Sequence, residues 1–367
     1  MPDPETIAGY SLGDVRRGLR DAIDRGDARP AARWTAELVA TPAAVGSLWA
    51  SYWVAWAAAA GGTGASPAIP ILLRQSWENI RVAAQTHLAV AATPADGWTE
   101  FRNDPQVRAI AAETTTRLLQ QPRQTPVIWP SKEIVAYDVS TMRAAPVPPA
   151  ADGPVVLGVW QRGDDALELR LMAGRFLTAL ETGDLRIALS AIAWSLMPTT
   201  VAELKVAPRG PSELTPRQRG SALWFWLELG RSALLARGAT LHRGWPTAHR
   251  AIAEAFAAHY RRWTAADRMR VLLAAVLQIR AALQAAPHPA SIWVAPPLSL
   301  RTADIDLPYK ELAAELAGDP DAALRPAPAA AVALSAKEEK RQAAARIEAQ
   351  MAAADARIMA MMGLTEE

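Results

Sequence analysis

The chain has 367 residues, of which 51% are hydrophobic and 6% aromatic, and its formal net charge is +2 at pH 7. This length allows two or three domains with a large core, and the small net charge excludes a strongly basic nucleic-acid-binding domain. The sequence contains no cysteine, which excludes disulfides, thiolate metal sites and cysteine nucleophiles. Alanine, the best helix former, supplies much of the apolar content, so we expect an all-α protein.

The first five residues are acidic and rich in proline. They lack the basic and apolar regions of a secretory signal peptide. We therefore expect an intracellular protein, cytoplasmic or nuclear, or a virion-associated one, and not a secreted one.

A helix–turn–helix pattern occurs twice, in residues 19–31 and again in residues 176–188. In each copy an apolar stripe leads to a glycine, Gly26 or Gly183, that suits a left-handed C-cap, and the following aspartate can cap the next helix. The pattern predicts helices over 12–25 and 27–40, and a matching pair in the second half. Two related helical halves of this kind usually build scaffolds and assembly surfaces.

The first hairpin and the segment after it also resemble a known family. Residues 10–90 are similar to the helical C-terminal collar region of replication-associated AAA+ ATPases, namely bacterial replication-recombination factors and clamp-loader subunits. The matching run comprises Ser11, Leu12, Val15, Leu19, Arg20, Ala22, Ile23, Arg25, Gly26, Asp27, Ala31, Trp34, Glu37 and Leu38, with a partial match at Trp77-Glu78-Asn79-Ile80. Because the sequence has no Walker A motif, the resemblance implies oligomerisation in a replication context without ATP hydrolysis.

The next predicted helix, 43–60, lies in a stretch without charge between Glu37 and Arg74. Either a buried central helix or a membrane span would fit this stretch. Trp49, Trp53 and Trp56 follow the i, i+4, i+7 spacing of a face packed into a core, and they lie in the middle of the segment, where a membrane span would not place them. We expect a buried helix, followed by a Gly-rich helix connector at 61–66.

Helices are then predicted over 69–90 and 105–121, the second one capped by Asp104 and begun by Pro105. Residues 125–140 suit either a short strand or irregular structure. We place an N-terminal helical domain at 1–141 and a Pro-rich linker at 142–154.

The C-terminal helical domain is expected at 155–317. It opens with a short strand over 155–160, and after the second hairpin it continues with helices over 218–236, 246–260 and 264–285. Thr264 and Asp267 form the pattern of a capping box. An irregular region, 286–307, and a short helix, 309–317, complete it.

An Ala/Pro linker at 318–334 separates this domain from a terminal amphipathic helix at 335–367, whose start carries the capping-box residues Ser335 and Glu338. The apolar spacing of this helix alternates by four and three residues, as in a coiled-coil seam. Such a helix either oligomerises or binds a partner, docks on its own body, or stays disordered. The seam residues are Ile347, Met351, Ala354, Ile358 and Met361.

The sequence contains no recognisable catalytic, cofactor-binding or metal-binding motif. None of the five histidines forms the His–Glu–x–x–His pattern of a helical zinc site, and no nucleophile motif appears. One arginine cluster has little acidic compensation and makes a candidate phosphate-binding site. It consists of Arg261, Arg262, Arg268 and Arg270, with Trp263 among them.

The favoured interpretation is a non-enzymatic helical assembly protein that binds protein partners or itself, in a DNA replication or repair complex or a large viral assembly. The alternative is a nucleic-acid-binding accessory protein that uses the arginine cluster. A third hypothesis is an enzyme whose site combines His249, Glu254 and His259, which requires a polar cleft that contains two of them. We expect no cofactor and no membrane association.

Overall fold

The computed structural model describes residues 5–42, 44–60, 66–121, 148–161, 163–196, 204–238, 241–284 and 300–317. Throughout this part of the chain the regular structure is helical, and an isolated β-bridge joins Glu5 and Ser11. The predicted all-α fold is confirmed. The predicted terminal helix 335–367 with its seam, the linker 318–334 and the segment 125–140 lie outside the described residues.

The first part of the chain contains six helices: α1 (Leu12–Arg25), α2 (Ala28–Ala40), α3 (Val45–Ala59), α4 (Ala68–Val90), α5 (Pro94–Asn103) and α6 (Pro105–Leu119). Five of them match the predicted ranges to within two residues at each end. Helix α5 was not predicted, although its start has clear capping chemistry: the Thr93 hydroxyl accepts the backbone N–H of Asp96 at 3.2 Å, and Pro94 takes the first helical position.

The second part comprises a 3₁₀ turn η1 (Pro149–Asp152), α8 (Pro154–Leu157), α9 (Leu167–Thr182), α10 (Leu185–Ser195), α12 (Pro216–Arg219), α13 (Ala222–Ala236), α14 (Gly244–His259), α15 (Ala265–Gln284) and α16 (Thr302–Leu316). The short strand predicted at 155–160 is wrong. Those residues begin within α8, where Pro154 presets the helical φ. The capping box of Thr264 and Asp267 is confirmed, because the side chain of each residue accepts the backbone N–H of the other.

Two other predicted ranges change. The single helix expected over 218–236 is split into α12 and α13, because Gly220 ends one helix and the Ser221 hydroxyl caps the next. The short helix expected over 309–317 begins earlier, at Thr302, and contains Pro308.

The two predicted hairpin positions both hold a pair of packed helices, α1 with α2 and α9 with α10. Gly26 and Gly183 adopt the left-handed conformation that ends the first helix of each pair, with φ of 75° and 85°. Asp184 caps its helix by accepting the N–H of Ile187 at 3.0 Å, whereas Asp27 binds the Arg25 guanidinium instead. That the two halves of the chain are related stays a prediction.

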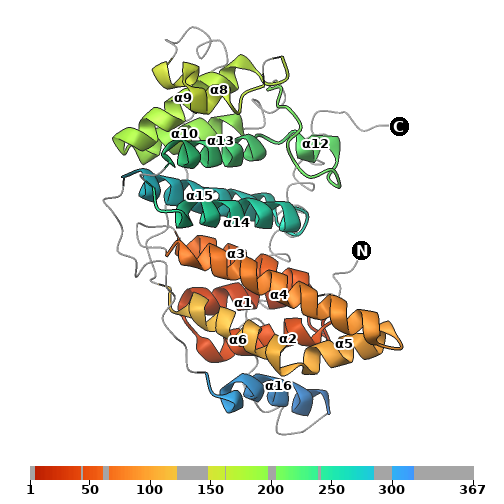
Figure 1. The fold of residues 1–367 in the computed structure, drawn as a ribbon. Helices are drawn as coiled ribbons and strands as arrows, with labels where there is room; N and C mark the ends of the chain where they lie inside the picture. The colour runs from red at the N-terminus through yellow and green to blue at the C-terminus, as the bar shows by residue number, and fades with distance from the viewer. Residues whose placement is uncertain are drawn as a thin grey trace, which may run out of the picture.

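The helices are stacked in layers along one direction (Figure 1). Helices α8, α9, α10 and α13 form one end, α14 and α15 follow, then α3 and α4, and then α1, α2, α5 and α6. Helix α14 packs on α4 and α15 packs on α3, so helices of the two predicted domains share one continuous hydrophobic core. Helix α16 belongs to the range predicted for the C-terminal domain, yet it packs on α2 and α6 at the opposite end of the stack.

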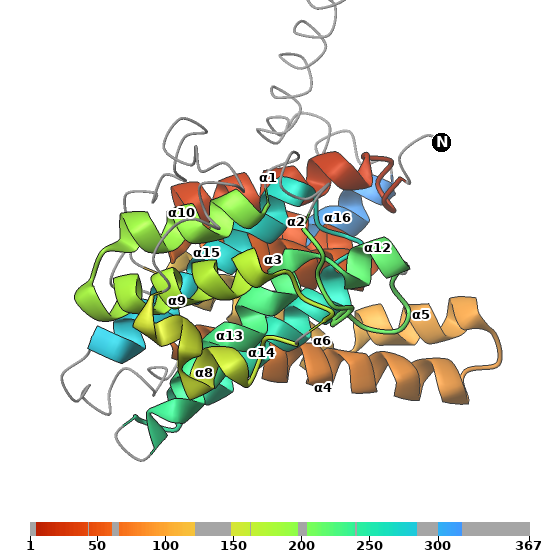
Figure 2. The same ribbon diagram turned by 90° about the horizontal axis from the view of Figure 1, so that it is seen from above.

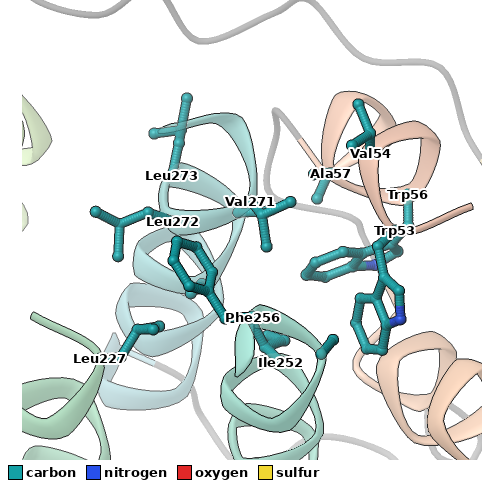
Figure 3. Close-up of a cluster of buried hydrophobic side chains, with 14 of the residues drawn as sticks. Trp53, Val54, Trp56, Ala57, Leu227, Ile252, Phe256, Val271, Leu272 and Leu273 are labelled. Carbon is teal, nitrogen blue, oxygen red and sulfur yellow. The ribbon is translucent and has the colours of Figure 1, made fainter. Parts of the chain in front are cut away.

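Tryptophans of α3 lie at the centre of this core. Trp49, Trp53 and Trp56 are at most 1% exposed, as the predicted buried helix requires. In Figure 3 the rings of Trp53 and Trp56 occupy the space between α3 and the pair formed by α14 and α15. Among the described helices, none combines the length and the apolar composition that a membrane crossing requires.

Candidate functional site

Helices α4 and α5 form an arm that reaches beyond the rest of the stack (Figure 2). The last buried residue of α4 is Ile80, and Ala83 and Ala84 are the last of its residues that pack against the core. Several apolar side chains there are exposed: Val82 to 49%, Leu88 to 37% and Val90 to 74%. This arm is the candidate interaction surface of the molecule, because exposed apolar side chains grouped on a projecting element mark protein-binding sites.

One side of α4 carries uncharged residues over its last turns, beyond the exposed ion pair of Glu78 and Arg81. Val82, Thr86, Ala89 and Val90 are exposed and lie on the same side of α4, because their spacing follows the helical repeat of 3.6 residues. A face without charge can meet an identical face without electrostatic repulsion. We call these four residues the arm face.

The arm is braced from its inner side. A Cβ atom at Gly97 would lie 3.0 Å from the carbonyl oxygen of His87, so the absence of a side chain there lets α5 approach α4 closely. The His87 ring lies 2.9 Å from the Asp104 carboxylate through Nε2, and it also contacts Phe101 edge to face. The arm is therefore held to α6 as well as to the rest of α4.

Asp104 makes two interactions that hold the arm in place. Its carboxylate interacts with His87, and it accepts the backbone N–H of Gln106 at 2.7 Å as the N-cap of α6. Burial alone would raise the pKa of Asp104, but the hydrogen bonds from His87 and from the start of α6 outweigh burial and lower it. The carboxylate is thus ionised when it meets His87 and the positive end of the helix dipole.

The arginine cluster is divided between exposed and structural positions. Arg261, Arg262 and Arg270 are exposed, whereas Arg268 is half-buried and its guanidinium lies over the Tyr260 ring at 4.4 Å. Trp263 is 3% exposed, and its indole N–H donates to the carbonyl oxygen of Ala50 at 2.9 Å. The Trp263 ring is therefore part of the core and is not available for stacking on a base.

Two arginines of α1 lie next to this arginine cluster. Arg16 donates to the carbonyl oxygen of Arg262 at 2.9 Å, and Arg20 pairs with Asp267 at 3.0 Å. Neither Arg262 nor Arg270 forms an ion pair with a described residue. The structure thus places the N-terminal arginines of α1 next to the predicted cluster, although the two sets are about 250 positions apart.

The structure brings together two of the three residues of the enzyme hypothesis, Glu254 and His259, and separates His249 from them. Glu254 and His259 line one cavity of about 400 Å³ between α3, α4 and α14, whereas His249 is buried elsewhere and bonds to the carbonyl oxygen of Leu227 at 2.8 Å. Glu254 pairs with Arg74 and Arg250. Both ring nitrogens of His259 are buried, so they are closed to a substrate in this cavity.

The environment of His259 also disfavours proton transfer. Burial, with the nearby guanidinium groups of Arg262 and Arg16, lowers the pKa of His259 to about 3. The imidazole is neutral at pH 7 and is a weak base. In the described part of the chain, no group of three or more His, Asp or Glu residues is placed to hold a metal ion.

The sequence reasoning missed the arm face. A signal was present, because the apolar stripe of the predicted helix 69–90 consists of Ile69, Leu73 and Ile80, and Val82 and Val90 fall outside it. Compared with protein-family models, curated proteins and solved structures, the chain matches none. The similarity of residues 10–90 to AAA+ collar regions therefore stays a prediction.

Proposed function

We propose that this protein is a non-enzymatic assembly module that associates with a second copy of itself through the arm face. The observation that carries the proposal is the uncharged, partly apolar surface of Val82, Thr86, Ala89 and Val90 on a projecting hairpin. In a two-fold contact each residue of the face meets the same face of the other copy. A surface without charge is suited to such a contact.

Rigidity of the arm supports the same function. A preformed hairpin loses less conformational entropy on binding than a flexible one does. The close approach at Gly97 and the His87–Asp104 contact hold the arm in one conformation before it binds. The resemblance of residues 10–90 to collar regions, which hold rings of subunits together, favours assembly and proposes a DNA replication or repair complex as its setting, with a viral assembly as the other.

The test is the molar mass in solution of the wild type and of Val82→Glu. A carboxylate at position 82 would place like charges against each other in the contact and would dissociate it. The matched control is Leu235→Glu on α13, because Leu235 is 55% exposed at the other end of the stack. Dissociation of the oligomer by Val82→Glu and not by Leu235→Glu supports the proposal. If the wild type is a monomer, the proposal of self-association is wrong, and the partner of the arm would be a different protein.

Nucleic-acid binding is the second candidate, and one observation favours it. Arg262 and Arg270 are exposed, form no ion pair with a described residue, and lie on the side of the stack where Arg16 projects from α1. The binding of a labelled DNA duplex would then weaken steeply with salt. Arg262→Gln should weaken it, and Arg186→Gln on α10, also exposed, is the control.

A further inference from the structure

A cavity of about 200 Å³ lies between α2, α6 and α16. Its walls are mostly apolar and small, with Ala32 from α2, Ala112 from α6 and Ile305 from α16. Hydroxyl groups line it at Thr35, Thr115, Thr116 and Tyr309, and Asp304 adds a carboxylate. Engineered apolar cavities of about 150 Å³ bind benzene, so this volume accommodates a molecule with a single ring.

Most hydroxyl groups around the cavity are already used. The Tyr52 hydroxyl lies 2.7 Å from that of Thr115 and 3.2 Å from that of Thr35, and the Thr115 hydroxyl also donates to the carbonyl oxygen of Ala111 at 2.9 Å. These three groups satisfy one another. They form a closed polar network beside the cavity.

The Tyr309 hydroxyl differs from them. It is buried, and among the described residues it has no hydrogen-bond partner. The guanidinium of Arg108 lies 4.4 Å from the centre of the Tyr309 ring and fixes its position. Burial raises the pKa of Tyr309, so the group keeps its proton and is a donor. A buried donor without an acceptor is unfavourable, and an acceptor brought by a ligand would relieve it.

The charge around the cavity restricts the ligand further. Asp304 is the single charged lining residue, and its carboxylate pairs with Arg301 at 2.9 Å. An anionic ligand would meet this carboxylate without a free cation to balance it. An uncharged ligand therefore suits the site.

We propose that this cavity binds an uncharged, single-ring molecule that carries one hydrogen-bond acceptor, which accepts the proton of the Tyr309 hydroxyl. Helix α16 forms one wall of the site, so the ligand and α16 stabilise each other's binding. The site does not depend on the arm face and lies on other helices.

Calorimetric titration of the full chain with cyclohexanone, cyclohexane and benzoate tests the proposal. Cyclohexanone has the ring and a carbonyl acceptor, cyclohexane has the ring alone, and benzoate adds a charge. We expect cyclohexanone to bind most tightly. Tyr309→Phe keeps the ring beneath Arg108 and removes the hydroxyl, so it should weaken cyclohexanone about tenfold and leave cyclohexane unchanged.

Two further variants keep the test decisive. Tyr10→Phe removes a hydroxyl that bonds to Glu315 of α16 outside the cavity, and it should leave cyclohexanone binding unchanged. Ala112→Phe fills the cavity and should abolish the binding of both rings. The proposal is overturned if the wild type binds none of the probes, if Tyr309→Phe binds cyclohexanone as the wild type does, or if a folded Ala112→Phe protein still binds.

Discussion

Trp263 and Ala50 lie 213 positions apart in the chain and are joined by a hydrogen bond of 2.9 Å from the indole N–H to the backbone carbonyl oxygen. The bond links the turn between α14 and α15 to α3, and the Trp263 ring also packs on Phe256 and His259. The two predicted domains therefore share a core at this point, and they should unfold together.

The first prediction concerns this shared core. Trp263→Ala should lower the free energy of unfolding by about 3–5 kcal/mol and keep a single transition in urea, because it removes a large buried ring. Trp98→Ala should lower the free energy of unfolding by a smaller amount, because Trp98 of α5 is only half-buried. Two separate transitions, with Trp263→Ala shifting just one of them, would contradict a common core.

The second prediction concerns the ion pair of Asp165 and Arg209, whose side chains are 0% and 2% exposed. Asp165 also accepts the backbone N–H groups of Gln161 and Ala207, each at 2.8 Å. Asp165→Asn removes the buried carboxylate and leaves the Arg209 guanidinium with Glu228, at 2.9 Å, as its remaining ionic partner, so the free energy of unfolding should fall by about 1.5–3 kcal/mol. Asp164→Asn, the exposed neighbour, should change it by less than about 0.5 kcal/mol.

The same pair gives a pH dependence. Burial opposes ionisation of Asp165, but the hydrogen bonds from Arg209 and the backbone outweigh burial and lower its pKa below the ordinary 3.8. The unfolded chain then binds more protons than the folded chain, so this stabilisation is present above pH 3.8 and is lost as the pH falls through the folded pKa. Urea titrations in acid should show a smaller loss of stability for Asp165→Asn than for the wild type.

The third prediction concerns His259, whose pKa is about 3 in the folded protein against an ordinary 6.5. Between these values the unfolded chain binds the extra proton, so stability should rise with pH there, by up to about 1.4 kcal/mol per pH unit for one group. His259→Phe keeps the ring contacts with Trp77 and Trp263 and should reduce that slope. The exposed His242→Gln is the control, and an unchanged slope in His259→Phe would contradict the assignment.

The fourth prediction concerns the docking of α16. Within this fully described helix Leu312 is the single fully buried residue and Tyr309 also packs against the core, so ion pairs to α2 and α6 make a large part of the docking contacts. Arg33 bridges Glu37 at 2.8 Å and Glu315 at 2.6 Å, while Arg29 and Arg108 pair with Glu311 and Asp306. Salt at about 1 M reduces the Debye length to about 3 Å, so the backbone amides of α16 should then exchange hydrogen faster.

Two variants distinguish the contributions of the individual ion pairs to the docking of α16. Arg33→Ala should speed amide exchange in α16 strongly, because it leaves Glu37, which is 0% exposed, without its guanidinium. Arg29→Ala should have little effect, since that side chain is 75% exposed. The amides of α13 provide the internal reference, and equal exchange of α16 at low and high salt would contradict electrostatic docking.

Much of the fold could be predicted from local signals. Gly26, Gly183 and Asp104 act through their own backbone or the next turn, and their caps form where the sequence indicates. The strand predicted at 155–160 failed because the apolar run was read without the effect of Pro154, which favours a first helical turn. Local chemistry could have corrected this error.

The candidate site could not be predicted in the same way. The docking of α16 on α2 depends on the ion pair between Arg33 and Glu315, which are 282 positions apart in the chain. No local sequence pattern predicts a contact between residues so far apart. Trp263 lies among exposed arginines in the sequence, and it is buried by α3, which is far away in the chain, together with α14. The exposure of Val82 likewise depends on how far α4 extends past its neighbours.

The molar mass of the full chain by light scattering tests the proposed assembly most directly, measured beside Val82→Glu, Leu235→Glu and a chain ending at Ala330, each at low and high salt. The arm face predicts a defined oligomer that Val82→Glu dissociates and that the other two variants retain. A monomer under all conditions would contradict this account. An oligomer lost solely on removal of residues 331–367 would do so as well, and would assign assembly to the terminal helix.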